Sequence, residues 1–265
     1  MDESRIIELY ENGMSLRKIE SIYGIPRKRS SKILKSNNIK IRTTEITSRK
    51  YDCDHQYFET IDSPDKAYWL GFVAADGFIE SKRKNGAQKL GITLSATDLH
   101  HLELFNKAIL STYEIKTYVG SGYNRNGEFV RLLITSQKMV DDLKKYGIIE
   151  GKTNVLKFPI NINEKYYNDF IRGYFDGNGS IYFQNNGQFG MSICGSEDIL
   201  SKIKQHYNIT SNVRDTKKGT FELSLNSSKN AYSVLKNMYY ENHPISLKRK
   251  YEKFSDLRNI LKDRV

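Results

Sequence analysis

The sequence predicts an α+β fold made of two pseudo-symmetric αββαββα halves with antiparallel, saddle-shaped sheets, preceded by a small all-α domain. Two observations predict it. An apolar helical segment, Trp69–Gly77 (WLGFVAADG), returns as Ile171–Gly179 (IRGYFDGNG). After each copy, a hairpin, a helix, a second hairpin and another helix follow in the same order, which indicates two structurally related halves. The 265 residues are long enough for one large domain or two modest ones, with a packed core.

The hairpins are predicted from turn residues and alternating strands. Asn-Gly turns favour hairpins because both central positions need positive φ. In chain order, the expected turns are Asn85-Gly86, Asn126-Gly127, Asn186-Gly187 and Lys218-Gly219. The expected helices cover about 98–110, 136–146, 197–207 and 228–239. We assign the first half to residues 67–160 and the second half to 161–265.

The N-terminal domain is expected to be a helix-turn-helix over residues 1–42. A first helix ends at Asn12-Gly13, Ser15 suits the N-cap of a second helix, and Gly24-Ile25-Pro26 ends that helix before a basic third helix at about 27–36. A helix, a tight turn and a basic helix are typical of major-groove binders. A small bundle with a solvated basic face is the alternative. Residues 43–66 are polar and are expected to be a linker.

Charge supports a DNA-binding N-terminal domain. The chain carries a net charge of +11, and its pI is near 9.4, which favours a polyanionic partner over a generally soluble basic protein. Nine Lys or Arg and one acid lie between Ser15 and Arg42, so a net +8 is concentrated there. The expected DNA contacts of this domain are Arg17, Arg27, Lys28, Arg29, Ser31, Lys32 and Lys35.

One face of each sheet is expected to be polar and to read a major groove. A shift of one residue would exchange the two faces of a strand. The residues expected on the DNA-facing side are Lys82, Lys84, Gln88, Arg131, Gln184, Gln188, Arg214 and Lys217.

Other classes of protein are not indicated. Cys53 and Cys194 are far apart, so no disulfide framework is expected. No apolar run is long enough to span a membrane, and the acidic N-terminus does not suit a signal peptide. We therefore expect an intracellular, cytoplasmic and DNA-associated protein that has no membrane partner. An organelle is not ruled out by these observations.

The repeated segment also suggests chemistry. Gly71 and Ala75 are four residues apart, as are Gly173 and Gly177, so two such helices can approach closely. A tightly packed core pair without chemistry would satisfy that spacing alone. Asp76, however, ends an apolar helix, where the helix dipole disfavours a carboxylate. A divalent cation such as Mg²⁺, which prefers oxygen ligands, would stabilise it.

The chain resembles the LAGLIDADG homing endonucleases over residues 60–255. The resemblance rests on the two repeated motifs, on the hairpin order and on the basic closures Gly151–Pro159 and Leu247–Phe254. It implies a monomeric, metal-dependent DNA endonuclease acting on a long, asymmetric duplex. The expected cofactor is Mg²⁺ or Mn²⁺, with Ca²⁺ as a non-activating substitute.

The resemblance also implies site residues. Asp76 matches the first metal-binding acid and Asn178 occupies the position of the second, with the carbonyls of Ala75 and Gly177 as further metal ligands. Lys152 and Lys250 match basic residues near the phosphate, although Lys248 is equally close to the motif. The position that orders water falls near Ala96 and Gly195, neither of which has a suitable side chain, so that role stays unassigned.

Asn178 departs from the family pattern. An amide oxygen can bind Mg²⁺ but contributes no charge, so this site should hold metal more weakly. An engineered inactive form, a natural enzyme that nicks one strand and a degenerate non-cutting binder would all carry such a residue. The rival functions are a non-cleaving DNA-binding regulator and an RNA-binding intron maturase.

Overall fold

The computed structural model describes residues 2–41, 50–81, 86–120, 127–184 and 188–262. It divides into two compact units, Met1–Tyr51 and Asp52–Val265. Among the described residues, none of the helices has the length and apolar character needed to cross a membrane.

The N-terminal unit contains three helices, α1 (Glu3–Glu11), α2 (Leu16–Tyr23) and α3 (Arg27–Ser36). The Ser15 side chain accepts a hydrogen bond from the Lys18 amide, as the N-cap prediction required. Gly24 ends α2 in the left-handed conformation, with φ of 67°, which glycine adopts without strain. A small core of Leu9, Tyr10, Ile19 and Leu34 holds the three helices together.

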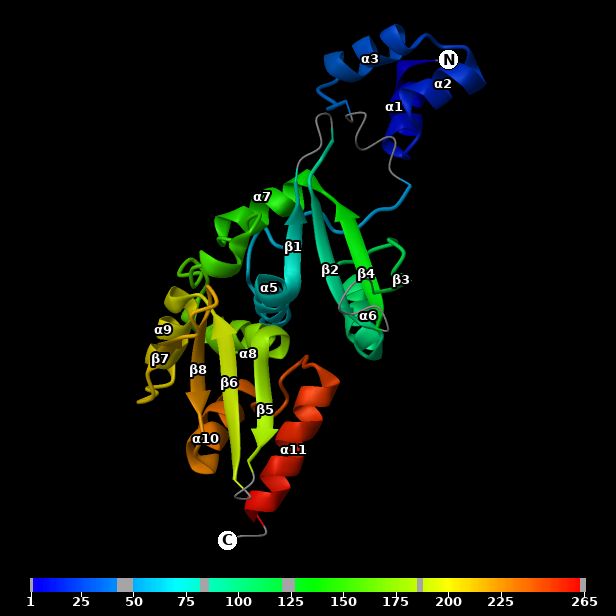
Figure 1. Ribbon diagram of the computed structural model, residues 1–265. Coiled ribbons are helices and arrows are strands. Elements are labelled where there is room, and N and C mark those ends of the chain that lie inside the picture. The colour runs from blue at the N-terminus through cyan, green and yellow to red at the C-terminus, as the bar shows by residue number, and fades with distance from the viewer. Residues whose placement is uncertain (1, 42–49, 82–85, 121–126, 185–187, 263–265) are drawn as a thin grey trace. The chain divides into compact units, whose positions relative to one another are not determined.

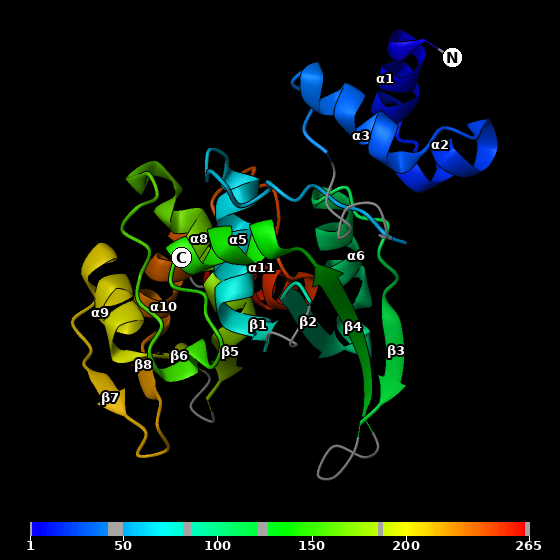
Figure 2. The same cartoon turned by 90° about the horizontal axis from the view of Figure 1, so that it is seen from above.

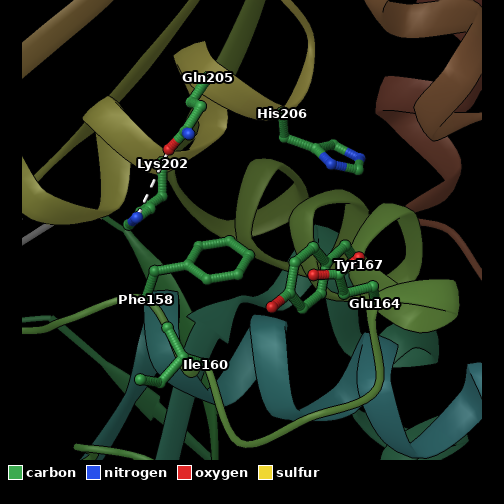
Figure 3. Close-up of a pocket in the computed structure, with 7 residues that line it drawn as sticks. All are labelled: Phe158, Ile160, Glu164, Tyr167, Lys202, Gln205 and His206. Atoms are coloured by element: carbon green, nitrogen blue, oxygen red, sulfur yellow. Dashed lines mark hydrogen bonds between the residues drawn. The ribbon is translucent and has the colours of Figure 1, made fainter.

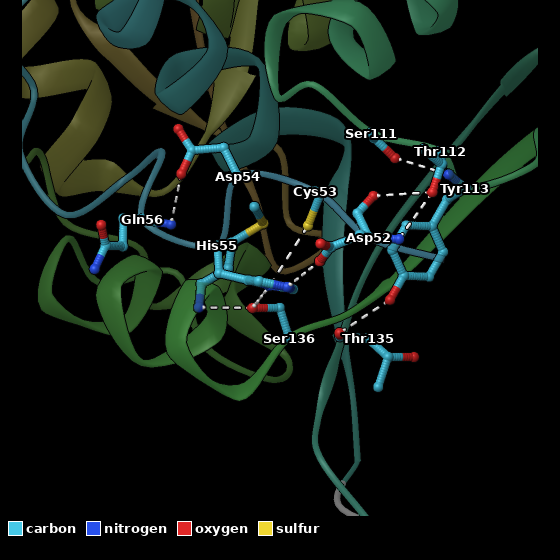
Figure 4. Close-up of polar contacts among 11 residues, drawn as sticks. Asp52, Cys53, Asp54, His55, Gln56, Ser111, Thr112, Tyr113, Thr135 and Ser136 are labelled. Atoms are coloured by element: carbon cyan, nitrogen blue, oxygen red, sulfur yellow. Dashed lines mark hydrogen bonds and ion pairs between the residues drawn. The ribbon is translucent and has the colours of Figure 1, made fainter. Parts of the chain in front are cut away.

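Most of the segment predicted as a linker belongs to the first half, so that domain boundary was wrong. The backbone of Asp52 pairs with Thr112, and His55 binds Asp52 at 2.9 Å and Ser136 at 2.7 Å (Figure 4). Behind this anchor, Tyr57, Phe58 and Ile61 are buried in the main core. Three apolar residues within five positions outweigh the polar composition around them, because burying each one is favourable.

The first half follows the predicted order of elements. In sequence they are α5 (Pro64–Asp76), β1 (Gly77–Glu80), β2 (Lys89–Ser95), the 3₁₀ turn η1 (Ala96–Asp98), α6 (Leu99–Ala108), β3 (Lys116–Val119), β4 (Glu128–Thr135), α7 (Gln137–Lys145) and the 3₁₀ turn η3 (Lys152–Asn154). The strands form an antiparallel sheet in the order β1-β2-β4-β3.

The second half repeats this order and ends with an additional helix. Its elements are η4 (Glu164–Tyr166), α8 (Tyr167–Asn178), β5 (Gly179–Phe183), β6 (Phe189–Gly195), α9 (Glu197–His206), β7 (Val213–Asp215), β8 (Phe221–Leu225), α10 (Ser228–Met238) and α11 (Lys248–Lys262). The sheet order β5-β6-β8-β7 is equivalent to that of the first half. Gly77 pairs with Ile92 and Gly179 with Ile193, so the register after each motif is the same. The sequence patterns did not predict α11.

Alternation along the strands gives each sheet an apolar face and a polar face. Leu90, Ile92 and Leu94 of β2 are buried in the core, where α6 and α7 pack against the strand. Thr93 and Arg131 are opposite each other on the other side, which we call the polar face of the first sheet. In the second sheet, Glu222 on β8 is paired with Arg214 of β7 on the equivalent face.

Helices α5 and α8 form the seam between the halves. They lie side by side in both views, with one sheet on either side of the pair (Figures 1 and 2). A Cβ atom added to Gly71 would overlap the carbonyl oxygen of Phe170, and one added to Gly173 would overlap that of Tyr68. Glycine at these two positions therefore permits the close backbone approach that the motif predicted.

Candidate functional site

The two helix ends meet at the seam, as the repeat predicted. A Cβ atom added to Gly177 would lie 3.2 Å from the carboxylate of Asp76, which places that carboxylate against the end of the opposite helix. Burial raises the pKa of Asp76, whereas the positive charges of Lys250, Lys152 and Arg249 oppose that increase. The Asp76 carboxylate thus lies where two helix C-termini meet, with three cations acting on it.

Lys152 and Lys250 occupy related places at these helix ends. Lys152 Nζ donates to the carbonyls of Gly77 at 2.5 Å and Ala75 at 3.4 Å. Lys250 Nζ donates to the carbonyls of Asp176 at 2.6 Å and Phe175 at 2.7 Å. Cations at a helix C-terminus satisfy free carbonyls and offset the negative end of the dipole. Both ammonium groups therefore stabilise the convergence of two helix ends.

The structure distinguishes Lys250 from Lys248, which the sequence could not. Lys250 is 3% exposed, while the Lys248 side chain is 83% exposed and pairs with Glu252 at 3.9 Å. Burial lowers the pKa of both Lys152 and Lys250 to about 8, because removal from water disfavours the charged form. The seam therefore contains two buried lysines whose pKa values lie near neutrality.

Asn178 ends α8 opposite Asp76 and is partly buried. Its neighbour is Tyr174, one turn earlier, whose hydroxyl donates to the Cys194 carbonyl at 3.3 Å. Burial raises the pKa of Tyr174 to about 12, and the hydrogen-bonding amide of Asn178 opposes that rise. The equivalent residue in the first half is Phe72, so the two motif ends differ in their surroundings as well as in the acid.

Asp176, the acid of the second motif, is held by hydrogen bonds inside the protein. It is fully buried, and its carboxylate accepts hydrogen bonds from Tyr239 Oη at 2.6 Å, Tyr68 Oη at 2.7 Å and the Leu247 amide at 2.7 Å. Burial raises its pKa, and these donors and Lys250 oppose the shift. With its oxygens committed to three protein donors, Asp176 connects α5, α8, α10 and the start of α11.

The metal-ligand candidates therefore lie together at the seam. Gly177 lies against Ala75 and Asp76 of the opposite helix, and Asn178 is the next residue after Gly177. The carbonyl of Ala75 also accepts from Lys152, so its remaining lone pair is the one left for a cation. No cluster of three or more His, Cys, Asp or Glu suited to a metal exists in the described parts of the chain. Any ion here would depend on Asp76, carbonyl and amide oxygens, water and the substrate.

One predicted DNA contact is wrong. Gln88 is buried on the apolar side, because alternate residues of a strand point to the same face and Leu90 and Ile92 point to the core. Its amide donates to Glu150 at 2.7 Å and accepts from Lys144 at 2.5 Å. Gln88 therefore joins the start of β2 to α7 and to Glu150, in the segment that follows α7. Lys82 and Lys84 lie outside the described residues.

The other sheet candidates lie at the polar faces. Arg131 donates to Thr93 at 2.9 Å and stacks over the ring of Tyr118, so its guanidinium is held in place. In the second sheet, Arg214 pairs with Glu222 at 2.5 Å. The structure also places Gln184, Gln188 and Lys217 near the hairpin ends, with Gln188 and Lys217 exposed.

A polar hollow of about 520 Å³ marks the face of the second sheet. Its lining consists of Tyr182, Ser211, Asn212, Arg214, Glu222, Ser224 and Asn226. Amides, hydroxyls and charged groups together are the groups that read base edges.

The N-terminal candidates form a basic surface on α2 and α3. Ser31 is half-buried, and the exposed ones are Arg17, Arg27, Lys28, Arg29, Lys32 and Lys35. Arg27 pairs with Glu20 at 2.7 Å, so part of its charge is already neutralised.

Two other polar sites lie away from this chemistry. A hollow of about 550 Å³ lies between the connector of the halves and α9, with Phe158, Tyr167 and His206 among its lining residues (Figure 3). The Asp52–His55–Ser136 cluster in Figure 4 has the composition of a hydrolytic triad. Ser136, however, is 1% exposed and caps α7, so that cluster is structural.

Sequence reasoning missed the contribution of α11. Besides Lys250, this helix contributes Arg249, which pairs with Asp98 of the first half at 3.1 Å. The basic run Lys248-Arg249-Lys250 can be seen in the sequence. Its partners cannot be inferred from it, because they are distant in sequence.

Comparison with known proteins agrees with this architecture. The model of a LAGLIDADG-like domain matches residues 63–146 and 165–239, more than half of the chain, with one match over each copy of the repeat. No curated protein sequence matches the chain.

Solved structures share the fold. The meganuclease I-SmaMI, bound to uncleaveable DNA with a TTCT central four, is 12% identical, with 75% of this chain and 90% of that chain covered and a TM-score of 0.52. The LAGLIDADG meganuclease I-AabMI, bound to uncleaved DNA, is 13% identical over 76% of this chain and 92% of that chain, with a TM-score of 0.52. I-SmaMI bound to an uncleaved DNA target in the presence of calcium ions gives 12% identity, 76% and 92% coverage and a TM-score of 0.52. This chain therefore belongs to the LAGLIDADG-like domain family, as shown by the family match over both repeats, together with the two motifs and the two sheets.

Proposed function

We propose that this protein is a sequence-specific DNA endonuclease that requires a divalent cation and cuts preferentially at the Asp76 end of its seam. The observation that carries the proposal is the convergence of Asp76 and two buried lysines at paired helix ends, between two polar sheet faces. The DNA-bound state of the similar meganucleases supports a duplex substrate.

The groups at the seam suit a hard divalent ion. Carboxylate, amide and carbonyl oxygens are the ligand types that Mg²⁺ accepts, and Mg²⁺ commonly keeps water and substrate oxygens in its shell. Asp76 would hold the ion, with Asn178 and the carbonyls of Ala75 and Gly177 beside it. A bound ion would supply an activated water and stabilise the leaving oxygen. The calcium present with one similar meganuclease supports divalent metal use here.

The chain's own residues would orient the phosphate and offset its charge. Lys152 and Lys250 are fixed by helix-end carbonyls, so their ammonium groups require little reorganisation. The two polar faces differ, with Arg131 in one and the Arg214–Glu222 pair in the other. A monomer with two different faces would bind a long, asymmetric double-stranded target.

Asn178 motivates the strand preference and also a second candidate function. The neutral amide weakens one of the two metal positions, so cleavage of one strand should be slower. If the loss affects both positions, the protein is a DNA-binding regulator that does not cut.

A cleavage assay separates these functions. The full chain and its Asn178→Asp variant are incubated with a randomised duplex library in Mg²⁺ or Mn²⁺, and the ends of each strand are sequenced. We expect nicks in one strand from the parent, cuts in both strands from Asn178→Asp, and only background from Asp76→Asn. If neither of the first two cuts any duplex, the endonuclease proposal fails, and sequence-selective binding would then favour the regulator. A preference for RNA of the same sequence would favour a maturase.

We also propose that the N-terminal unit binds DNA through the basic surface of α2 and α3. Deleting residues 1–42 should weaken binding of the selected duplex and reduce the salt slope, because each lost phosphate contact removes about 0.9 from that slope. The matched control replaces the acidic residues Glu3 and Glu11 with Gln and should not weaken binding. An unchanged salt slope after the deletion would exclude this role.

A further inference from the structure

Arg249 lies in the first turn of α11, and its side chain extends to the opposite half of the molecule. Its Nε donates to both carboxylate oxygens of Asp98, at 3.1 and 3.2 Å, across 151 residues of sequence. Asp98 belongs to η1, directly after β2. The ion pair therefore ties the start of the last helix to the end of a strand in the first half.

The two partners of this pair differ in exposure. The Asp98 side chain is 9% exposed, whereas that of Arg249 is 55% exposed. Among the described residues, Asp98 is the only hydrogen-bonding partner of the Arg249 side chain. Both hydrogen bonds come from Nε of Arg249. The two Nη groups keep four N–H donors for another acceptor. A buried carboxylate thus holds the guanidinium through Nε and leaves its Nη donors unused.

Arg249 is also close enough to the seam to act on it. It is one of the three cations, with Lys152 and Lys250, whose charges interact with the Asp76 carboxylate. It immediately precedes Lys250, whose ammonium is bound to the end of α8. The seam's Asp76 carboxylate therefore has a third cation near it, besides the two lysines.

The first half has no cation at the position that corresponds to Arg249. Lys152 and Lys250 bind corresponding helix ends, so the counterpart of Arg249 is the residue before Lys152. That residue is Gly151, in the left-handed conformation with φ of 64°. The asymmetry of the two motif ends therefore extends to the groups around them.

We infer that Arg249 binds a phosphate of one DNA strand at the Asp76 end of the seam, and that Asp98 is its positioning residue. The inference rests on the proposed function, since it needs a duplex across the polar faces. A planar guanidinium presents paired donors that match phosphate oxygens, and phosphate contacts fix the register of a duplex. With Asp98 holding Nε, the Nη edge is the part of Arg249 that can make this contact.

A binding cycle tests the inference without requiring cleavage. Duplex selected by the full chain is bound in Ca²⁺, with a neutral methylphosphonate replacing each central phosphate of either strand in turn. For the parent, we expect weaker binding when the phosphates near Lys152 and Lys250 are neutralised. We also expect one further position, on one strand only, to weaken binding by about tenfold, the size of a charge-assisted hydrogen bond. Arg249→Gln should bind unmodified duplex about tenfold more weakly and lose the dependence on that phosphate.

Matched variants separate this role from general charge and from folding. Lys248→Gln removes the same charge from the neighbouring exposed residue and should keep the parent's phosphate profile. Arg249→Lys should retain part of the dependence, and Asp98→Asn should reduce it while Arg249 is still present. Thermal unfolding of each variant checks the fold, and the two Arg249 variants decide the matter if Asp98→Asn does not fold.

Two results would overturn the inference. One is an identical phosphate profile for the parent and Arg249→Gln, and the other is an equal loss of dependence on both strands. A selected duplex with an unchanged profile would refute only the role of Arg249. Failure to select any duplex would refute the proposed function and this inference together.

Discussion

The two copies of the repeated helix perform the same packing but are stabilised differently. In the first copy, Phe72, Val73 and Ala74 are apolar and buried. In the second, the polar residues Arg172, Tyr174 and Asp176 occupy corresponding or adjacent places and are buried as well. One helix is fixed by apolar packing, and the other is fixed by hydrogen bonds to the C-terminal part of the chain.

The polar contacts of the second copy converge on the segment before α11. Arg172 donates to the carbonyls of Met238 and Ile245 and to Asp169, at 3.1, 2.8 and 2.8 Å. Asp176 accepts from the Leu247 amide, directly before α11. Buried polar groups are costly unless they are hydrogen-bonded, and these groups are hydrogen-bonded to the backbone segment that leads to Lys250. The comparison shows that Asp176 has a structural role, whereas the role that we propose for Asp76 is chemical.

The largest expected effect is the loss of the Asp176 carboxylate. Asp176→Ala leaves two tyrosine hydroxyls, one amide and Lys250 without a buried acceptor or counter-charge, so we expect a loss of about 3–5 kcal/mol in the free energy of unfolding. Chemical denaturation measures this. Tyr68→Phe and Tyr239→Phe each remove one donor and should cost about 1 kcal/mol. A change below that of either single tyrosine variant would show that the second copy is not fixed by this carboxylate.

An intermediate effect is expected where the copies are alike. Gly71→Ala and Gly173→Ala each push a methyl group into a backbone carbonyl of the opposite helix. Overpacking of this kind costs about 1–3 kcal/mol, whereas alanine in an exposed helix would stabilise. Thermal unfolding of the two variants should give similar losses. A large difference between them would mean that the seam is not pseudo-symmetric in its packing.

The last prediction concerns His101 of the first half, whose effect appears only below neutral pH. Its Nε2 contacts Tyr68 Oη at 3.0 Å, and burial lowers its pKa to about 3, from an ordinary value of 6.5. Between those values the unfolded chain binds the proton and the folded chain does not. Stability from this residue is therefore complete above pH 6.5 and falls as the pH decreases below it, by up to about 1.4 kcal/mol per pH unit.

His101→Gln keeps an amide donor for Tyr68 and cannot titrate in this range. Unfolding free energies of the parent and this variant, measured from pH 7 to pH 4.5, should converge or cross as the pH falls. Parallel pH profiles would show that His101 does not contribute to acid sensitivity.

Much of the fold and part of the site could be predicted from local patterns. Turn residues, alternation and the repeated motif gave the hairpins, the seam and the position of Asp76. The boundary near residue 52 and the burial of Gln88 could not be predicted in this way. Tyr57 and Phe58 are buried in a core that is built mainly by residues later in the chain. The face on which Gln88 lies changes with a shift of one residue in the strand register.

The sequence by itself determined that there are two halves, that small residues let their helices approach, and that one motif ends in Asp76 and the other in Asn178. Those properties are local, because spacing and side-chain size are carried by neighbouring residues. The tertiary structure decided which lysine reaches the seam, which groups hold Asp176, and where Arg249 lies. Each of those depends on partners 63 to 151 residues away (Lys250 with Asp176, Tyr239 with Asp176, Arg249 with Asp98), which only the folded chain brings together.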